Sequence, residues 1–152
     1  MPSMNSLLAR LTSDYPELRF TPDSRYAWAP ETHTVHFNAE DHDEILLLHE
    51  LSHGILGHKS YQEDLSLVNM EAAAWEKARE ISSKYGISIS EEVINDNLNT
   101  YRDWMHARST CPDCSASGYQ SGAKEYTCPA CTCRWQVNEA RLCGLKRKKI
   151  RQ

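Results

Sequence analysis

Apolar residues recur at helical spacing in four stretches of the chain, and each stretch predicts a helix. We expect these helices over about residues 3–12, 43–57, 65–85 and 90–108. The second stretch is apolar in nearly every direction around its axis, which is typical of a helix buried in a core. The acidic stretch "AEDHDE" provides N-cap and first-turn carboxylates for this helix, which begins near Asp43, and Gly86 is in position to end the third helix. The second helix is therefore expected at the centre of the fold.

Residues 24–38 show a different, alternating pattern that predicts two short strands. Aromatic and β-branched residues flank the sequence "APET", which suits a tight turn. In "TVHFN", Val35 and Phe37 alternate with polar residues, so one face of the second strand should be buried. We therefore expect an α+β fold with a mainly helical core and a small β-hairpin before the central helix.

The predicted central helix carries the sequence His49-Glu50-Leu51-Ser52-His53, an HExxH motif. Residues four apart on a helix lie about 40° from each other, so both imidazoles can reach one ion while Glu50 holds a water beside them. A carboxylate buried without a partner is costly, and a metal ion removes that cost. The alternative is a chance pattern made by ordinary core histidines.

A catalytic zinc needs a third protein ligand from elsewhere in the chain. His58 could ligate only if the chain turns sharply at Gly57. The metzincin pattern is excluded, because Leu56 and Lys59 stand where it requires glycine and histidine. Glu71 lies on the predicted inward face of the third helix, among small alanines, and is the better candidate. Its alternative role is a carboxylate stabilised near a helix N-terminus.

The two motifs together resemble the ImmA/IrrE family of bacterial and phage metallopeptidases. That family has a strand, a helix carrying HELGHxxLGH, and a further helix that opens with glutamate and alanine. The matching stretches here are "HELSHGILGH" and "EAAAW", and the likeness covers about residues 24–85. Ser52 replaces the usual glycine and Trp75 the usual phenylalanine, and both changes are mild.

The resemblance implies a zincin-like core with His49, His53 and Glu71 as zinc ligands and Glu50 as general base. It also implies that His58 is commonly present without being a ligand. A weaker resemblance links the chain to SprT-like DNA-associated proteases, which also pair HExxH with a cysteine module. Those proteases use a third histidine downstream of the motif, and this chain offers only His58 and His106 there.

A second metal motif lies near the C-terminus, where two CPxC sequences are separated by thirteen residues. Its four thiolates predict a tetrahedral zinc site in a small zinc ribbon. They are Cys111, Cys114, Cys128 and Cys131. The rival interpretations are a rubredoxin-like iron site, disulfides and a redox CxxC pair. Cys133 could replace Cys131, and Cys143 is expected to be a spare thiol. Zinc would supply most of the stability of so polar a module.

The charge is unevenly distributed along the chain. Residues 141–151 hold six basic side chains and no acid, whereas residues 1–140 carry a net charge of −10. Such a tail is most often a disordered, solubilising end, although it also suits nucleic-acid binding. The chain shows no export signal and no apolar run of about 20 residues. We therefore expect a soluble, cytoplasmic protein without membrane contact.

These features predict a zinc metallopeptidase with one catalytic and one structural zinc. We divide the chain into a metallopeptidase domain (residues 1–109), a zinc ribbon (110–138) and a basic tail (139–152). The expected substrate is a specific intracellular protein, such as a regulator, which the ribbon would recruit. The alternative is a non-catalytic module with two structural zincs that binds nucleic acid or protein.

Overall fold

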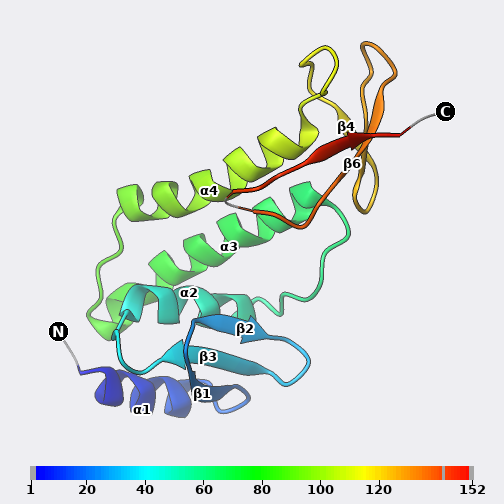
Figure 1. Ribbon diagram of the computed structural model, residues 1–152. Coiled ribbons are helices and arrows are strands. Elements are labelled where there is room, and N and C mark those ends of the chain that lie inside the picture. The colour runs from blue at the N-terminus through cyan, green and yellow to red at the C-terminus, as the bar shows by residue number, and fades with distance from the viewer. Residues whose placement is uncertain (1–2, 142, 151–152) are drawn as a thin grey trace. The chain divides into compact units, whose positions relative to one another are not determined.

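The computed structural model describes residues 3–141 and 143–150 (Figure 1). Helices account for 44% of the described residues. The fold is therefore mixed α+β, and the expectation of a mainly helical core is not confirmed. In the described part of the chain, no helix combines the length and apolarity needed to cross a membrane. The elements in chain order are α1 (Met4–Asp14), β1 (Arg19–Asp23), β2 (Ala27–Ala29), β3 (Thr34–Asn38), α2 (Glu44–Ile55), α3 (Asp64–Ser82), a 3₁₀ turn (Ser83–Tyr85), α4 (Glu91–Ser109), β4 (Tyr119–Gly122), β5 (Glu125–Thr127), β6 (Arg134–Val137) and β7 (Arg147–Lys149).

The chain divides into two compact units. Residues 1–60 and 70–94 form unit 1, and residues 61–69 and 95–152 form unit 2. Both units include parts of α3 and α4, because those helices run through the boundaries. The predicted division at residues 109/110 and 138/139 remains a prediction.

Unit 1 contains a three-stranded sheet in the order β1-β3-β2. β2 and β3 are antiparallel, with Trp28 opposite Val35, which confirms the predicted hairpin. β1 was not predicted; it runs parallel to β3 on the other side, with Phe20 opposite Val35. No residue of β1 is buried and the strand contains Pro22, which suits an edge strand. Its sequence therefore lacks the alternation that reveals β3.

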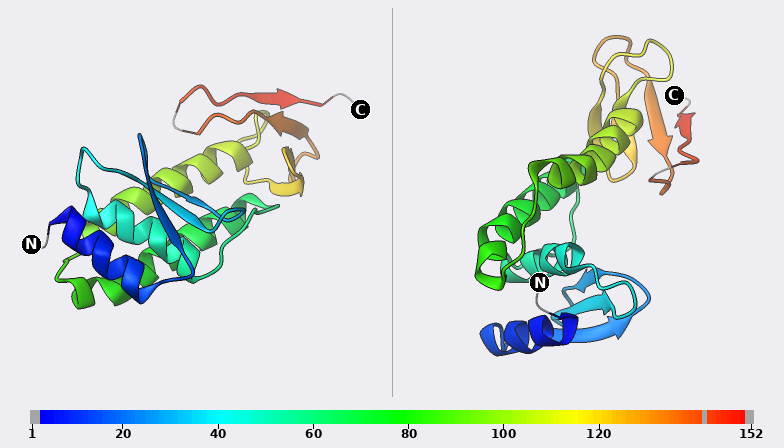
Figure 2. Two further views of the ribbon diagram at one scale, coloured as in Figure 1. Left: turned by 90° about the horizontal axis from the view of Figure 1, so that it is seen from below. Right: turned by 90° about the vertical axis from the view of Figure 1, so that its left-hand side faces the viewer.

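Helix α2 lies between the sheet and α3 (Figures 1 and 2). The predicted cap from the acidic stretch before it is Asp43, whose carboxylate accepts a hydrogen bond from the backbone N–H of Leu46 at 3.0 Å. Leu47, Leu48 and Leu51 have no exposed surface. The central position is thus confirmed, but burial on every side is not, since Ile45, Leu46 and Ile55 of this helix are only partly buried.

Helix α3 and the 3₁₀ turn that follows it span the third predicted helix. Gly86 ends this stretch with a φ of 69°, as its position after the helix predicts. The inward face of α3 carries Glu71, Ala74, Trp75 and Ala78, all buried. The two alanines leave room for the neighbouring helix, so Glu71 and Trp75 can approach α2 closely.

Unit 2 contains a four-stranded antiparallel sheet in the order β4-β5-β6-β7. Its core cluster consists of Cys111, Tyr126, Cys128, Trp135 and Val137. The module therefore has a small apolar core of its own, formed mainly by residues outside the polar segment between the two cysteine pairs. β7 is formed by the basic tail, so this part of the tail is an ordered strand rather than the expected disordered end.

A buried ion pair joins the start of α3 to the end of α4 within unit 2. Arg108 Nε donates to the carboxylate of Asp64 at 2.8 Å, and both side chains are at most 5% exposed. The Tyr126 hydroxyl also donates to this carboxylate. Arg108 Nη1 donates to the carbonyl of Asn138 at 2.7 Å, and the Trp135 indole donates to the Arg108 carbonyl at 2.9 Å. This network ties the start of α3 and the end of α4 to the four-stranded sheet.

Candidate metal centres

The first candidate centre lies in unit 1, where α2 and α3 face each other. His49 and His53 are one helical turn apart on α2, and Glu71 reaches them from α3. The carboxylate of Glu71 lies 2.8 Å from His49 Nε2 and 3.2 Å from His53 Nε2. The two ring nitrogens are 3.3 Å apart. All three side chains are buried, and their ligand atoms could hold a metal ion.

The spacing of these donor atoms is close to that around a small tetrahedral ion, although Glu71 and His49 lie closer together than such an ion requires. Ligand atoms about 2.0–2.2 Å from such an ion lie about 3.3–3.5 Å from each other. Two imidazoles and one carboxylate are also a donor set that zinc accepts. The three residues chosen from the sequence are therefore brought together as expected, and Glu71 rather than His58 completes the set.

The charge balance of this centre favours ionised Glu71. Burial by itself raises the pKa of the Glu71 carboxyl, but hydrogen bonds with His49 and His53 outweigh that effect and lower the pKa to about 2. A carboxylate that keeps its charge inside a core is ready to bind a cation. The donor atoms of the centre thus include a full negative charge.

Glu50 follows His49 on α2 and is only partly buried. Burial raises the pKa of its carboxyl, while the charges of His49 and His53 oppose that shift. The carboxylate also accepts a backbone hydrogen bond from Trp28 on β2. Glu50 is not among the three converging ligands. It is therefore a carboxylate beside the candidate centre and not part of it.

The two histidines have different surroundings behind their converging nitrogens. The ring of His49 stacks on Trp75, with centroids 4.1 Å apart and planes 20° from parallel. Among the described residues, His49 Nδ1 is buried without a hydrogen-bond partner. His53 Nδ1 instead lies 2.8 Å from Nδ1 of His58. The chain does turn at Gly57, with a φ of 69°, but the turn brings His58 behind His53 and not to the ligand side.

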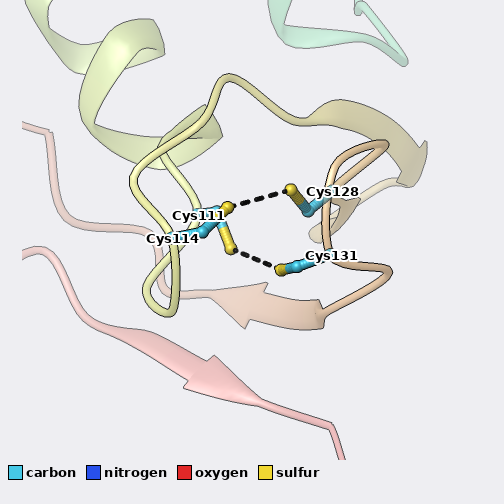
Figure 3. A group of neighbouring side chains, drawn as sticks. All are labelled: Cys111, Cys114, Cys128 and Cys131. Atoms are coloured by element: carbon cyan, nitrogen blue, oxygen red, sulfur yellow. Dashed lines mark hydrogen bonds between the residues drawn. The ribbon is translucent and has the colours of Figure 1, made fainter.

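The second candidate centre is the cysteine cluster of unit 2, in which the sulfurs of two loops point toward one another (Figure 3). The Sγ atoms of Cys111 and Cys131 are 3.6 Å apart, and those of Cys114 and Cys128 are 3.5 Å apart. These distances exclude disulfides, whose sulfurs are about 2.05 Å apart. They match thiolates about 2.3 Å from one tetrahedral ion, which lie about 3.8 Å from each other.

The two cysteine loops have the same backbone hydrogen bonds, seventeen residues apart. The N–H of Cys111 donates to the Ala116 carbonyl at 2.8 Å, and the N–H of Cys128 donates to the Cys133 carbonyl at 2.8 Å. Ser115 and Thr132 both have a positive φ and donate back to the first cysteine of their loop at 3.0 Å. Such paired turns direct two thiolates of each loop to one side.

This repetition decides between Cys131 and Cys133. Cys133 takes the position that Ala116 holds in the other loop, where the backbone carbonyl closes the turn and no thiol is needed. The four sulfurs that converge belong to Cys111, Cys114, Cys128 and Cys131, as the spacing indicated. Desolvation opposes ionisation of Cys111, but backbone N–H groups of Cys114 and Asp113 lower its pKa to about 6.

Comparison with known proteins adds no assignment: no family model matches the chain, and no curated protein or solved structure is significantly similar to it. The resemblance to the ImmA/IrrE family therefore depends on the two motifs alone and stays a prediction. The geometry supports two candidate metal centres, one formed by two histidines and a glutamate and the other by four cysteines.

Proposed function

We propose that the chain is a zinc-dependent metallopeptidase whose reaction takes place beside His49, His53 and Glu71. The observation that carries the proposal is the convergence of two Nε2 atoms and one carboxylate within 3.3 Å, with Glu50 next to His49 on the same helix. A purely structural centre with this donor set would not require a further carboxylate beside it. The neighbouring Glu50 therefore favours hydrolysis over a structural role.

Each residue of the proposed site has a distinct task. Zinc, when bound, would polarise the scissile carbonyl and lower the pKa of water to about 7. Glu50 would accept a proton from the attacking water and pass it to the leaving amine. Trp75 stacks on His49 and restricts the orientation of that ring. The zinc ribbon of unit 2 would hold a structural zinc and recruit a specific protein substrate.

The first experiment counts metal ions. Wild-type protein purified with zinc should hold two ions per chain. His49→Ala should lose one ion and Cys111→Ser the other, since the two donor sets share no residue. A wild type with a single ion, lost only from the cysteine variant, would contradict the metallopeptidase proposal.

The second experiment measures peptide cleavage. Zinc-loaded wild type is incubated with a peptide library made from a proteome, and new termini are identified by mass spectrometry. Glu50→Gln should keep its zinc and lose about 10²- to 10⁴-fold of the cleavage rate, the usual contribution of a general base. Glu40→Gln changes an exposed carboxylate just before the same helix and is the matched control. Equal cleavage by wild type and Glu50→Gln would refute the proposed mechanism.

A second candidate function is nucleic-acid binding by the ribbon, and the exposure of the basic strand favours it. Lys146, Arg147, Lys148 and Lys149 are all exposed. Lys149 pairs with Asp113, so the available charge is smaller than the sequence indicates. Stacking on Trp135 is excluded, because its ring is fully buried. Two results together would support this function: binding to a mixed-sequence oligonucleotide that weakens as the salt concentration rises, and weaker binding by the double variant Lys146→Ala/Lys148→Ala than by wild type.

A further inference from the structure

The contact between His53 and His58 in unit 1 has no assigned role in the proposed reaction. The two Nδ1 atoms are 2.8 Å apart, a distance at which one must donate a proton to the other. The rings are tilted by 60° with centroids 5.1 Å apart, so they meet edge to edge rather than by stacking. The contact is therefore a hydrogen bond and not simply packing.

The backbone around His58 holds the ring in this place. Gly57 adopts a φ of 69°, which turns the chain back toward α2. The N–H of His58 then donates to the carbonyl of His53 at 2.9 Å. The carbonyl of His58 accepts the indole N–H of Trp28 at 2.8 Å. Because both bonds use the main chain, a change of the His58 side chain leaves them in place.

The direction of the side-chain hydrogen bond follows from the converging geometry. His53 points Nε2 at Glu71 and at His49, so Nε2 is the atom that would bind an ion. An imidazole that binds a cation through Nε2 carries its proton on Nδ1. That proton can only go to His58 Nδ1, which must therefore be the acceptor. His58 would then hold its own proton on Nε2.

We propose that His58 is a positioning residue that fixes the tautomer and orientation of His53 by accepting its Nδ1–H. The inference rests on the proposed role of His53 as a zinc ligand. It gives the site an asymmetry, since His49 has the face of Trp75 behind it and no hydrogen-bond partner at Nδ1 among the described residues. His53 is held by a hydrogen bond and His49 by packing.

The test is the zinc affinity of the full chain, measured by competition with a chromogenic chelator after the cysteine centre has been filled. His58→Ala should weaken the remaining centre by about 10- to 100-fold, the usual effect of losing such a partner. His58→Asn should stay close to wild type, because its amide oxygen can accept the same proton from a similar place. Lys59→Ala, a change at the next and exposed residue, should have no effect.

Two results would overturn the role of His58. One is His58→Ala that binds zinc as tightly as wild type. The other is His58→Asn that is as weak as His58→Ala, which would mean that ring volume matters and the acceptor does not. A wild type that binds no second zinc would instead overturn the proposed function, and the two failures are therefore distinguishable without any cleavage assay.

Nitrogen NMR of zinc-loaded wild type tests the proposal without a substitution. We expect the proton of His53 on Nδ1 and the proton of His58 on Nε2. A neutral His58 protonated at Nδ1 would contradict the proposal, because it would leave two donors facing each other across 2.8 Å.

Discussion

The buried ion pair of unit 2 gives a sharp prediction, which is the loss of stability in Asp64→Ala. The carboxylate of Asp64 is 3% exposed and accepts hydrogen bonds from Arg108 and from the Tyr126 hydroxyl. Removing it leaves the Arg108 guanidinium with the Asn138 carbonyl and the ring of Trp104, 4.6 Å away, as partners. A buried charge that loses its counter-ion costs about 3–5 kcal/mol.

The loss is large relative to the stability of a small unit, which is about 0.05–0.15 kcal/mol per residue. The experiment therefore uses zinc-loaded protein, since apparent zinc binding of about 10–16 kcal/mol keeps such a ribbon folded. The free energy of opening is measured from hydrogen exchange of the Trp135 indole N–H. That proton is bonded to the Arg108 carbonyl and so reports on this network.

Two further variants make the reasoning refutable. Tyr126→Phe removes one hydrogen bond to a charged group and should cost about 1.5–3 kcal/mol. The double variant should cost less than the sum of the two, because Tyr126 donates to the atom that Asp64→Ala removes. Glu63→Ala, at the neighbouring and exposed position, is the control. A cost below about 1 kcal/mol for Asp64→Ala would show that Asp64 is not needed to stabilise the buried charge of Arg108.

Two more predictions concern one glycine of the ribbon and one carboxylate of unit 1. A Cβ on Gly118 would lie 2.5 Å from the Trp135 ring and 2.9 Å from a backbone oxygen, so Gly118→Ala should destabilise the ribbon by about 1–3 kcal/mol or more, whereas Gly122→Ala meets nothing closer than 3.4 Å and should be tolerated. Zinc release on chemical unfolding compares the two, and equal midpoints would contradict the packing argument. The hydrogen bond from the Tyr85 hydroxyl lowers the pKa of Asp14 below its ordinary 3.8. The stability that Asp14 provides is therefore present above pH 3.8 and lost as the pH falls further, so the protection of α1 amides in wild type and Asp14→Asn should converge there; a constant difference would contradict it.

The centre in unit 1 was predictable because its signals are local. His49 and His53 lie one turn apart, and helical periodicity alone places Glu71 on the inward face of α3. The capping of α2 by Asp43 and the end of the third helical stretch at Gly86 follow from short-range rules as well. Each of these features depends on residues within a few positions of one another, so the chain itself indicates them.

The features that sequence reasoning missed depend on residues far apart. β1 is exposed and contains Pro22, and only its pairing with β3 makes it a strand. The sequence of β7 is a run of basic residues, and it forms a strand only because it pairs with β6. The pairing of Asp64 with Arg108 joins positions 44 residues apart and has no local signature.

The strand β7 has a consequence for how the protein behaves at high concentration. It covers the side of β6, whose Trp135 and Val137 belong to the ribbon core. Its own outer side carries three exposed basic residues, Arg147–Lys149, and like charges discourage a second sheet from adding there. A chain shortened before β7 would expose the unpaired backbone of β6 and should aggregate by edge-to-edge association, even though every cysteine of the cluster is still present.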